Sequence, residues 1–166
     1  MIVINFDCCL KLVIDTSVIN TILKYKQVKR KNESGGILLG KKDINDDTYY
    51  ITSVTTPSLF DKAGPIMFVR SGKHAQKTIN RLWSESGGIV NYLGEWHTHN
   101  EKAPTPSLID KALLKQIYIE KSNPFNYFFM LILGNDGKLF VGVVDSGLGC
   151  KLKYQKYVNI EEEMNA

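Results

Sequence analysis

The sequence has few of the residues that hold small secreted proteins together: three cysteines among 166 residues, an odd number. Cys8, Cys9 and Cys150 show no CxxC spacing, so neither a disulfide framework nor a thiolate zinc cluster is indicated. No apolar run approaches the roughly eighteen residues that a membrane-spanning helix needs. The first residues contain no basic segment and no small-residue cleavage site. We therefore expect no signal peptide, no membrane association and a cytoplasmic protein.

Charge is also modest, since 21 basic and 17 acidic residues leave a formal net charge of +4. Much of the basic excess lies in KYKQVKRK, residues 24–31, which we interpret as a solvated helix end. No nucleic-acid motif and no aromatic interleaving accompany this run, so we expect no nucleic-acid partner. A content of 43% hydrophobic and 23% charged residues is typical of one compact globular domain.

Strand-like and helix-like patterns mix along the chain and predict a single α/β domain over residues 1–160, followed by a frayed acidic end at 161–166. Residues 73–86 carry Ala75, Ile79, Leu82 and Trp83 on one helical face, and a Gly-Gly pair ends this helix. Residues 58–72 read as irregular. The other expected helices cover 15–28 and 107–121; the expected strands cover 2–13, two segments within 33–57, 89–99, two segments within 126–145 around a Gly-Asn-Asp-Gly turn, and 151–160.

The stretch LGEWHTHNEKAPTPSLIDKAL, residues 93–113, contains two of the three histidines of the chain. On a strand, His97 and His99 lie on the same face with Cα atoms roughly 6.5–7 Å apart, so both imidazoles can reach one ion. After a Pro-rich turn, Ser107 opens a helix with Asp110 in its first turn. Taken alone, this S-x-x-D pattern is a helix-capping box, and an isolated H-x-H pair is more often surface decoration than a pair of ligands.

Two imidazoles and one nearby carboxylate together are typical of a catalytic zinc site, which has three protein ligands and an open fourth position. We therefore predict that His97, His99 and Asp110 bind Zn²⁺. Ser107, one helical turn before Asp110, is placed to stabilise an oxyanion. A general base is still missing from this stretch, and we expect a Glu from elsewhere to supply it. The chain has no HExxH motif, which excludes a thermolysin-like helical zinc site.

The pattern E…H-x-H-x(7)-S-x(2)-D resembles the JAMM motif of the JAB/MPN zinc metallopeptidases, the deubiquitinase-like isopeptidases. His97-Thr98-His99, seven intervening residues, Ser107 and Asp110 match it without a gap, and "ESGGILLG" supplies the upstream glutamate as Glu33. The resemblance implies a cytidine-deaminase-like fold, a mixed β-sheet flanked by helices. It also implies that Glu33 passes a proton to the leaving amine and that Ser107 binds the oxyanion.

The segment "YLGEWHTH…PTPSLID" is similar to sequences of the bacterial branch of this family that is found in type II CBASS anti-phage operons. That resemblance implies a substrate in which the C-terminus of a CD-NTase, or of a ubiquitin-like protein, is conjugated to a target. It also implies a fused E1–E2-like conjugating enzyme as the operon partner. Asn100 departs from the pattern, since bacterial relatives commonly have Pro there, and we expect only a local loop difference.

Two other functions fit the same residues: a processing peptidase for a ubiquitin-like or sulfur-carrier precursor, and a non-catalytic MPN scaffold. Scaffolds typically lack the metal ligands, which this chain retains. Glu95 lies on the histidine-bearing face and competes with Glu33 for the role of the acid, or orients a ligand. We expect Trp96 in the core and His74 at the surface. The pair Gly35-Gly36 indicates either close approach of a bound peptide or a strand bulge.

Overall fold

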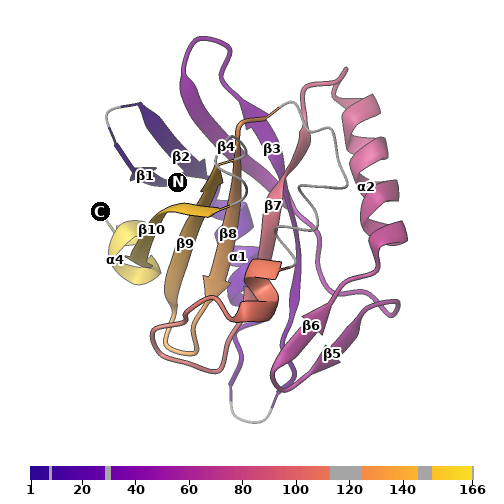
Figure 1. Cartoon of the computed structure of the whole chain (residues 1–166), viewed down its shortest axis with the longest axis vertical. Coiled ribbons are helices and arrows are strands. Elements are labelled where there is room, and N and C mark those ends of the chain that lie inside the picture. Colours follow the sequence, from indigo (N-terminus) through magenta and orange to yellow (C-terminus); the bar gives the residue numbers. More distant parts are fainter. Residues whose placement is uncertain (8, 29–30, 113–124, 146–150, 166) are drawn as a thin grey trace.

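The computed structural model describes all of the chain except residues 8, 29–30, 113–124, 146–150 and 166. Its centre is a mixed sheet of eight strands in the order β1-β2-β4-β3-β7-β8-β9-β10 (Figure 1). Neighbouring strands are antiparallel except for the parallel pairs β2–β4 and β7–β8. The strands are β1 Ile2–Asn5, β2 Leu10–Ile14, β3 Gly35–Lys42, β4 Asp47–Val54, β7 Asn91–Thr98, β8 Tyr127–Leu133, β9 Lys138–Asp145 and β10 Lys151–Asn159. The expected α/β domain with a mixed sheet is confirmed.

Helices cover both faces of this sheet. Val18, Ile19 and Ile22 of α1, Thr16–Leu23, pack into the larger of two buried clusters, together with Leu38 of β3. Ala75 and Ile79 of α2, Gly72–Glu85, pack into the smaller cluster, together with the neighbouring β3 residues. Because successive residues of a strand point to opposite faces, the two clusters lie on opposite sides of the sheet. The remaining elements are α4, Ile160–Asn165, and a small separate hairpin of β5, Lys62–Gly64, and β6, Met67–Val69.

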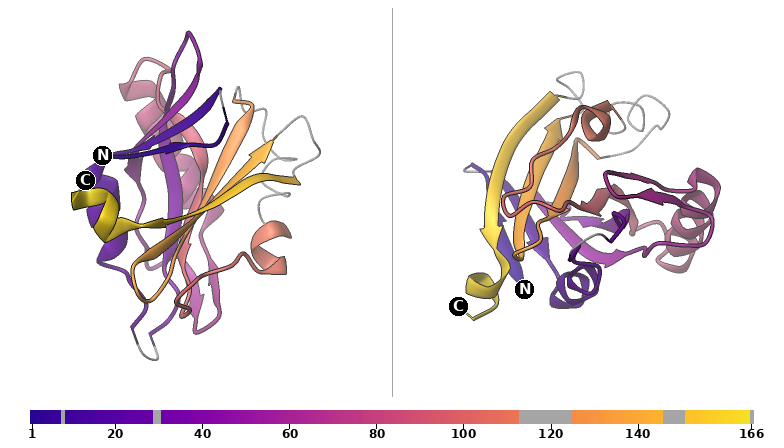
Figure 2. Two further views of the ribbon diagram at one scale, coloured as in Figure 1. Left: turned by 90° about the vertical axis from the view of Figure 1, so that its left-hand side faces the viewer. Right: turned by 90° about the horizontal axis from the view of Figure 1, so that it is seen from below.

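The sheet is curled, so that its two edge strands approach each other (Figure 2). The rings of Phe6, which follows β1, and Tyr154 of β10 lie 5.8 Å apart. The Tyr154 hydroxyl donates to Asp7 Oδ2, and Lys156 Nζ donates to the carbonyl oxygen of Asn5. These contacts join the first and last strands of the sheet order, which are far apart in sequence.

Several predicted boundaries were wrong. The single strand expected at 2–13 is two antiparallel strands, because Asp7 Oδ1 accepts the backbone N–H groups of Cys9 at 2.8 Å and Leu10 at 2.7 Å and turns the chain. Helix α1 ends at Leu23 rather than near residue 28. Residues 58–72 contain the β5–β6 hairpin. At the acidic end, Ile160–Asn165 form the short helix α4, of which only Ile160 is buried, so the frayed end expected at 161–166 stays a prediction.

Other predictions were confirmed. Strands β3 and β4 form the expected pair, and β8 and β9 pair around the Gly-Asn-Asp-Gly turn, where Gly137 has φ 92°. Helix α2 is followed by Gly87 and Gly88, with φ 65° and 86°, the left-handed conformation that glycine adopts readily. Trp83 is an exception on that helix, because 51% of it is exposed. The described part of the expected helix 107–121 is helical over 108–112, and its remainder lies outside the described residues.

Candidate metal centre

Strand β7 lies between β3 and β8 and delivers both histidines to its C-terminal end. The strand pairs His97 with Gly35 on one side and with Ile132 on the other. The backbone N–H of His99, one residue beyond β7, donates to the carbonyl oxygen of Leu133 at 3.0 Å and so continues the strand geometry. His97 and His99 are each only 8% exposed, and their ring centroids lie 4.8 Å apart. The structure thus places the two imidazoles side by side, as the i, i+2 spacing predicts.

A bulge in β7 determines to which face of the sheet the side chains of the following residues point. The register between β3 and β7 shifts so that Leu38 pairs with Gly94 and Leu39 with Tyr92, which leaves Leu93 without a partner in β3. Gly94 has φ 142°, and a Cβ atom there would lie 1.9 Å from the carbonyl oxygen of Phe129. Only glycine fits this position, so the bulge depends on Gly94, two residues before the buried Trp96.

Asp110 approaches the histidines from the helical turn at 108–112, which lies beside the end of β7 (Figure 1). Its Oδ1 is 3.3 Å from His97 Nε2, and its Oδ2 is 3.5 Å from His99 Nε2. The capping box is formed as well: Ser107 N–H donates to Asp110 Oδ2 at 2.6 Å, and Asp110 N–H donates to Ser107 Oγ at 3.2 Å. The two interpretations of S-x-x-D therefore describe one arrangement, in which the cap orients the carboxylate.

Glu33 reaches the same point from the segment that precedes β3. It is 8% exposed, and its Oε1 lies 4.0 Å from His99 Nε2. Its backbone N–H donates to the carbonyl oxygen of Gly64 at 2.8 Å, in the turn of the β5–β6 hairpin. The next residue, Ser34, donates its N–H to Thr98 Oγ1 at 3.0 Å, which fastens this segment to β7.

The four side chains perturb one another electrostatically. Burial raises the pKa of Glu33 above its ordinary value, although the two imidazoles act in the opposite direction. Burial alone would raise the pKa of Asp110 and lower that of His99. The contacts between them outweigh burial, so the pKa of Asp110 is held well below its usual range and the pKa of His99 is raised.

The donor set fits a divalent metal ion. One nitrogen from each histidine and one carboxylate oxygen of Asp110 all lie within 4.8 Å of one another. His97 Nε2 is buried and makes no hydrogen bond of good geometry within the part of the chain that the structure describes, although it lies 3.3 Å from the carboxylate. A buried nitrogen without a hydrogen-bond partner has its lone pair available for a metal. Two imidazoles and one carboxylate are ligands that suit zinc and leave a coordination position open.

A cleft of about 580 Å³ opens beside this centre. Ser107 lies on its wall and is exposed, so its hydroxyl is accessible to a bound molecule. The lining also includes Glu33, His99, Gln27, Ile66 and Glu101. Neither Gln27 nor Glu101 carries a signal in its local sequence, because Gln27 lies in a polar, basic run and Glu101 in a Pro-rich loop.

Glu95 is occupied elsewhere in the structure. Its Oε1 accepts Arg70 Nε at 2.7 Å and the Tyr92 hydroxyl at 3.0 Å, and Arg70 Nη2 lies 2.7 Å from the same oxygen. The geometry therefore favours Glu33 over Glu95 as the acid next to the histidines. Neither Arg70 nor Tyr92 carried a sequence signal, since their partner is identified only by the folded chain.

The remaining singled-out residues have structural explanations. Trp96 is 1% exposed, in the core as expected, and its Nε1 donates to the carbonyl oxygen of Thr55 at 2.9 Å. A Cβ at Gly36 would lie 2.2 Å from that same oxygen, so the close approach at Gly35-Gly36 is made by the chain itself. His74 is exposed, as expected.

Two further expectations concern the loop after β7 and the cysteines. Asn100 Oδ1 accepts Asn135 Nδ2 at 3.1 Å, which ties this loop to the β8–β9 turn. Cys9 is exposed, and Cys8 and Cys150 lie outside the described residues.

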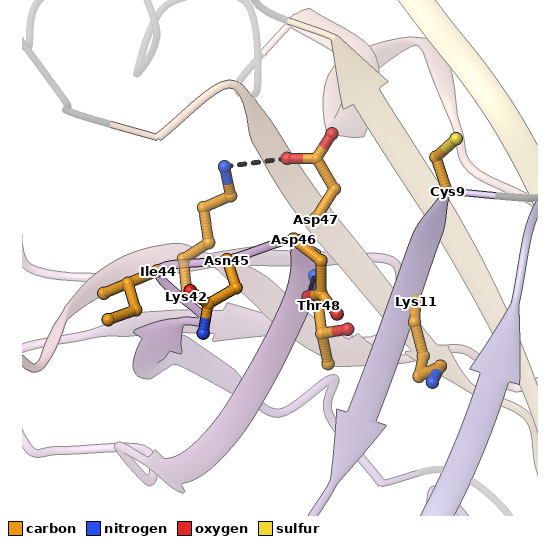
Figure 3. A pocket seen from close by; sticks show the side chains of 8 residues that line it. All are labelled: Cys9, Lys11, Lys42, Ile44, Asn45, Asp46, Asp47 and Thr48. Carbon is orange, nitrogen blue, oxygen red and sulfur yellow. Dashed lines mark hydrogen bonds and ion pairs between the residues drawn. The ribbon is translucent and has the colours of Figure 1, made fainter.

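A second hollow, of about 550 Å³, lies at the turn between β3 and β4 (Figure 3). It lies at the opposite end of β3 from Gly35, the residue that pairs with His97, a separation of roughly 20 Å along the strand. Its Lys42 Nζ pairs with Asp47 Oδ1 at 2.7 Å. This hollow is therefore separate from the candidate metal centre.

Comparison with known proteins agrees with the fold. Residues 15–142 match the family of prokaryotic homologues of the JAB domain. A protein named CD-NTase/cGAS isopeptidase from Escherichia coli is 37% identical over 99 residues, 59% of this chain and 62% of the relative. A protein of the same name from Vibrio cholerae is 33% identical over 106 residues, 63% of this chain and 65% of the relative. The matched part thus spans less than two thirds of either relative.

A protein from Desulfitobacterium hafniense, solved in solution, superposes with a TM-score of 0.58 over 89% of this chain and 90% of that one. At 17% identity it supports the fold alone. Among the described residues, no helix has the length and apolar character to cross a membrane. The family match covers more than half of the chain and agrees with the resemblance found in the sequence. The chain therefore belongs to the prokaryotic branch of the JAB domain family.

Proposed function

We propose that this protein is a JAMM-type zinc isopeptidase that hydrolyses the amide bond after the C-terminus of a conjugated protein. The observation that carries the proposal is the convergence of His97, His99 and Asp110 with a buried acid, Glu33, 4.0 Å from His99. A scaffold would have no need for this set, whose buried polar groups are costly to keep in a fold.

The roles follow from the positions of the side chains. His97, His99 and Asp110 would hold Zn²⁺, which supplies Lewis-acid activation of water and of the scissile carbonyl when it is bound. Glu33, with its raised pKa, accepts a proton from the attacking water and delivers it to the leaving amine. Ser107, accessible in the cleft, donates its hydroxyl hydrogen to the developing oxyanion, because its oxygen already accepts the N–H of Asp110.

The substrate that we propose is a CD-NTase joined through its C-terminus to a target amine, with a ubiquitin-like conjugate as a related possibility. Support comes from the names of the relatives, CD-NTase/cGAS isopeptidase. A role in bacterial antiviral defence (CBASS), a cytoplasmic location and an E1–E2-like conjugating enzyme as operon partner belong to the same proposal. Processing of a ubiquitin-like or sulfur-carrier precursor uses the same chemistry with a different leaving group.

The decisive experiment incubates the purified protein with a CD-NTase conjugate, with a linear precursor, and with each substrate plus chelator. We expect cleavage of the conjugate, about one zinc ion per chain, and loss of turnover by a factor of about 10³ or more in His99→Ala and Glu33→Ala. His74→Ala, an exposed histidine on α2, is the matched control and should cleave normally. Cleavage of the linear precursor alone would favour the processing peptidase, and a zinc-free, inactive wild type would favour the scaffold.

A further inference from the structure

Gln27 is a buried polar side chain in a segment that the sequence assigns to a solvated helix end. It is 1% exposed. Its Nε2 donates to the carbonyl oxygen of Lys31 at 2.6 Å and to that of Pro65 at 3.2 Å. Because both partners are acceptors, the amide nitrogen and oxygen of this side chain are unambiguously placed. One side chain therefore bridges two chain segments that are far apart in sequence.

The two carbonyl groups flank Glu33 and its backbone partner. Lys31 lies two residues before Glu33, and Pro65 follows Gly64, whose carbonyl oxygen accepts the Glu33 N–H at 2.8 Å. Asn32 Nδ2 adds a long contact to Ala63 at 3.4 Å, but Asn32 is exposed. Gln27 thus supplies the buried part of a short set of bonds that join residues 27, 32 and 33 to the β5–β6 hairpin.

Sheet pairing does not fix the position of Glu33. Strand β3 begins at Gly35, and its pairing with β7 begins at the same residue. The Glu33 backbone N–H bonds to Gly64, and the next residue, Ser34, is fastened to Thr98 of β7. The distance of Glu33 from His99 therefore depends on the hairpin contact as well as on β7.

We propose that Gln27 is a positioning residue for Glu33, an inference that rests on the proposed function of Glu33 as the proton-transferring acid. Gln27 Oε1 is buried and has no hydrogen-bond partner among the described residues. An unpartnered amide oxygen is costly, and an apolar side chain of the same size would avoid that cost. The contribution of glutamine at this position is therefore the pair of hydrogen bonds from its nitrogen, which orient the segment carrying Glu33.

The test compares Gln27→Met, which keeps the size and removes both donors, with Gln76→Met, a matched change at an exposed glutamine of α2. Hydrogen exchange in the absence of substrate should be faster at the Glu33 amide in Gln27→Met alone, with zinc content unchanged. On a lysine-linked amide, kcat should fall by about 10- to 100-fold with little change in KM, because small displacements of a catalytic group carry losses of this size. On an aryl ester of the same acyl tail, the loss should be clearly smaller, because the leaving group needs no proton and only the proton transfer from the attacking water still depends on Glu33.

Gln27→Leu, which also removes both donors without adding a charge, should behave like Gln27→Met and serves if the methionine variant does not fold. Unchanged Glu33 exchange, or equal losses on amide and ester, would overturn the positioning role. If zinc-loaded wild type cleaves neither substrate, the proposed function itself fails, and the exchange measurement still reports on the Gln27 contacts.

Discussion

At the scale of single residues, the carboxylate of Asp110 lies within about 3.5 Å of both imidazoles of the candidate metal centre. Asp110, whose side chain is 13% exposed, lies 3.3 Å from His97 and 3.5 Å from His99. Burial opposes this arrangement, yet the pKa of Asp110 is lowered and that of His99 is raised. Proton binding and metal binding to the His99 imidazole therefore compete with each other.

This competition predicts opposite pH dependences for the metal-free and the zinc-loaded protein. Because the folded-state pKa of His99 lies above its ordinary value of 6.5, its contribution to the free energy of unfolding is complete below pH 6.5 and is lost as pH rises through the raised pKa. Zinc needs the neutral imidazole, so zinc affinity should rise over the same interval. Urea denaturation with chelator, and zinc titration, at about pH 6 and about pH 8 test this. A metal-free stability that does not change would contradict it.

A second residue-scale prediction separates the two acids near the histidines. Glu95 and Arg70 form an ion pair with side chains 18% and 16% exposed. Removing one charge leaves the other poorly solvated, so Glu95→Gln should lower the free energy of unfolding by about 1–3 kcal/mol. It should leave zinc content unchanged and kcat within about threefold, whereas Glu33→Gln should nearly abolish turnover. Chemical denaturation and single-turnover assays decide; equal kinetic losses in both variants would restore Glu95 as a candidate acid.

Sequence reasoning succeeded at this scale where a function depends on neighbours in the chain. The i, i+2 histidines and the Ser107–Asp110 cap can be read from local spacing. Gln27 and Pro65, or Arg70 and Glu95, are 38 and 25 residues apart, and nothing in either local pattern marks them as partners. Glu33 was found through family resemblance, since its neighbours alone gave no reason to place it near the histidines.

At the scale of elements, the bulge in β7 determines which side chains face the candidate metal centre. Adding a methyl group at Gly94 would bring it against the Phe129 carbonyl in a backbone conformation that other residues rarely adopt. Gly94→Ala should therefore lower the free energy of unfolding by about 2–4 kcal/mol and reduce zinc content, because the histidines lose their common orientation. Gly72→Ala, where a Cβ meets nothing within 4 Å, is the control and should be neutral. Thermal denaturation and metal analysis measure both; a stable, zinc-loaded Gly94→Ala would contradict the role of the bulge.

Element types were predicted well from periodicity, and their ends less well. The first strand was read too long because loose alternation continues through residues 2–13, while the turn depends on hydrogen bonds that Asp7 makes with the backbone. The β5–β6 hairpin escaped notice because its strands have three residues each, too few to show a period.

At the scale of the whole molecule, the curled sheet depends on contacts between its two edges that no local pattern reveals. Asp7 is the centre of these contacts, and the Tyr154 hydroxyl, with the N–H groups of Leu10 and Cys9, lowers its pKa to about 2. Tyr154→Phe should raise that pKa toward the ordinary 3.8, because it removes the largest of these contributions. Asp7 contributes to the free energy of unfolding above its ordinary pKa of 3.8, and this contribution is lost as pH falls toward about 2. In Tyr154→Phe the contribution should be smaller, and it should be lost at a pH closer to 3.8. NMR titration of Asp7 tests this, and an unchanged midpoint would show that the edges do not meet there.

The parallel pairing of β7 and β8 also has a consequence for how such a centre can arise. Two parallel neighbours cannot be joined by a tight turn, so the chain must travel back the length of the sheet before β8 begins. The connection begins after His99, and the carboxylate of Asp110, on the helical turn at 108–112 of this connection, reaches both histidines. The topology thus brings the proposed third ligand, Asp110, to the two histidines on the connection that parallel pairing requires.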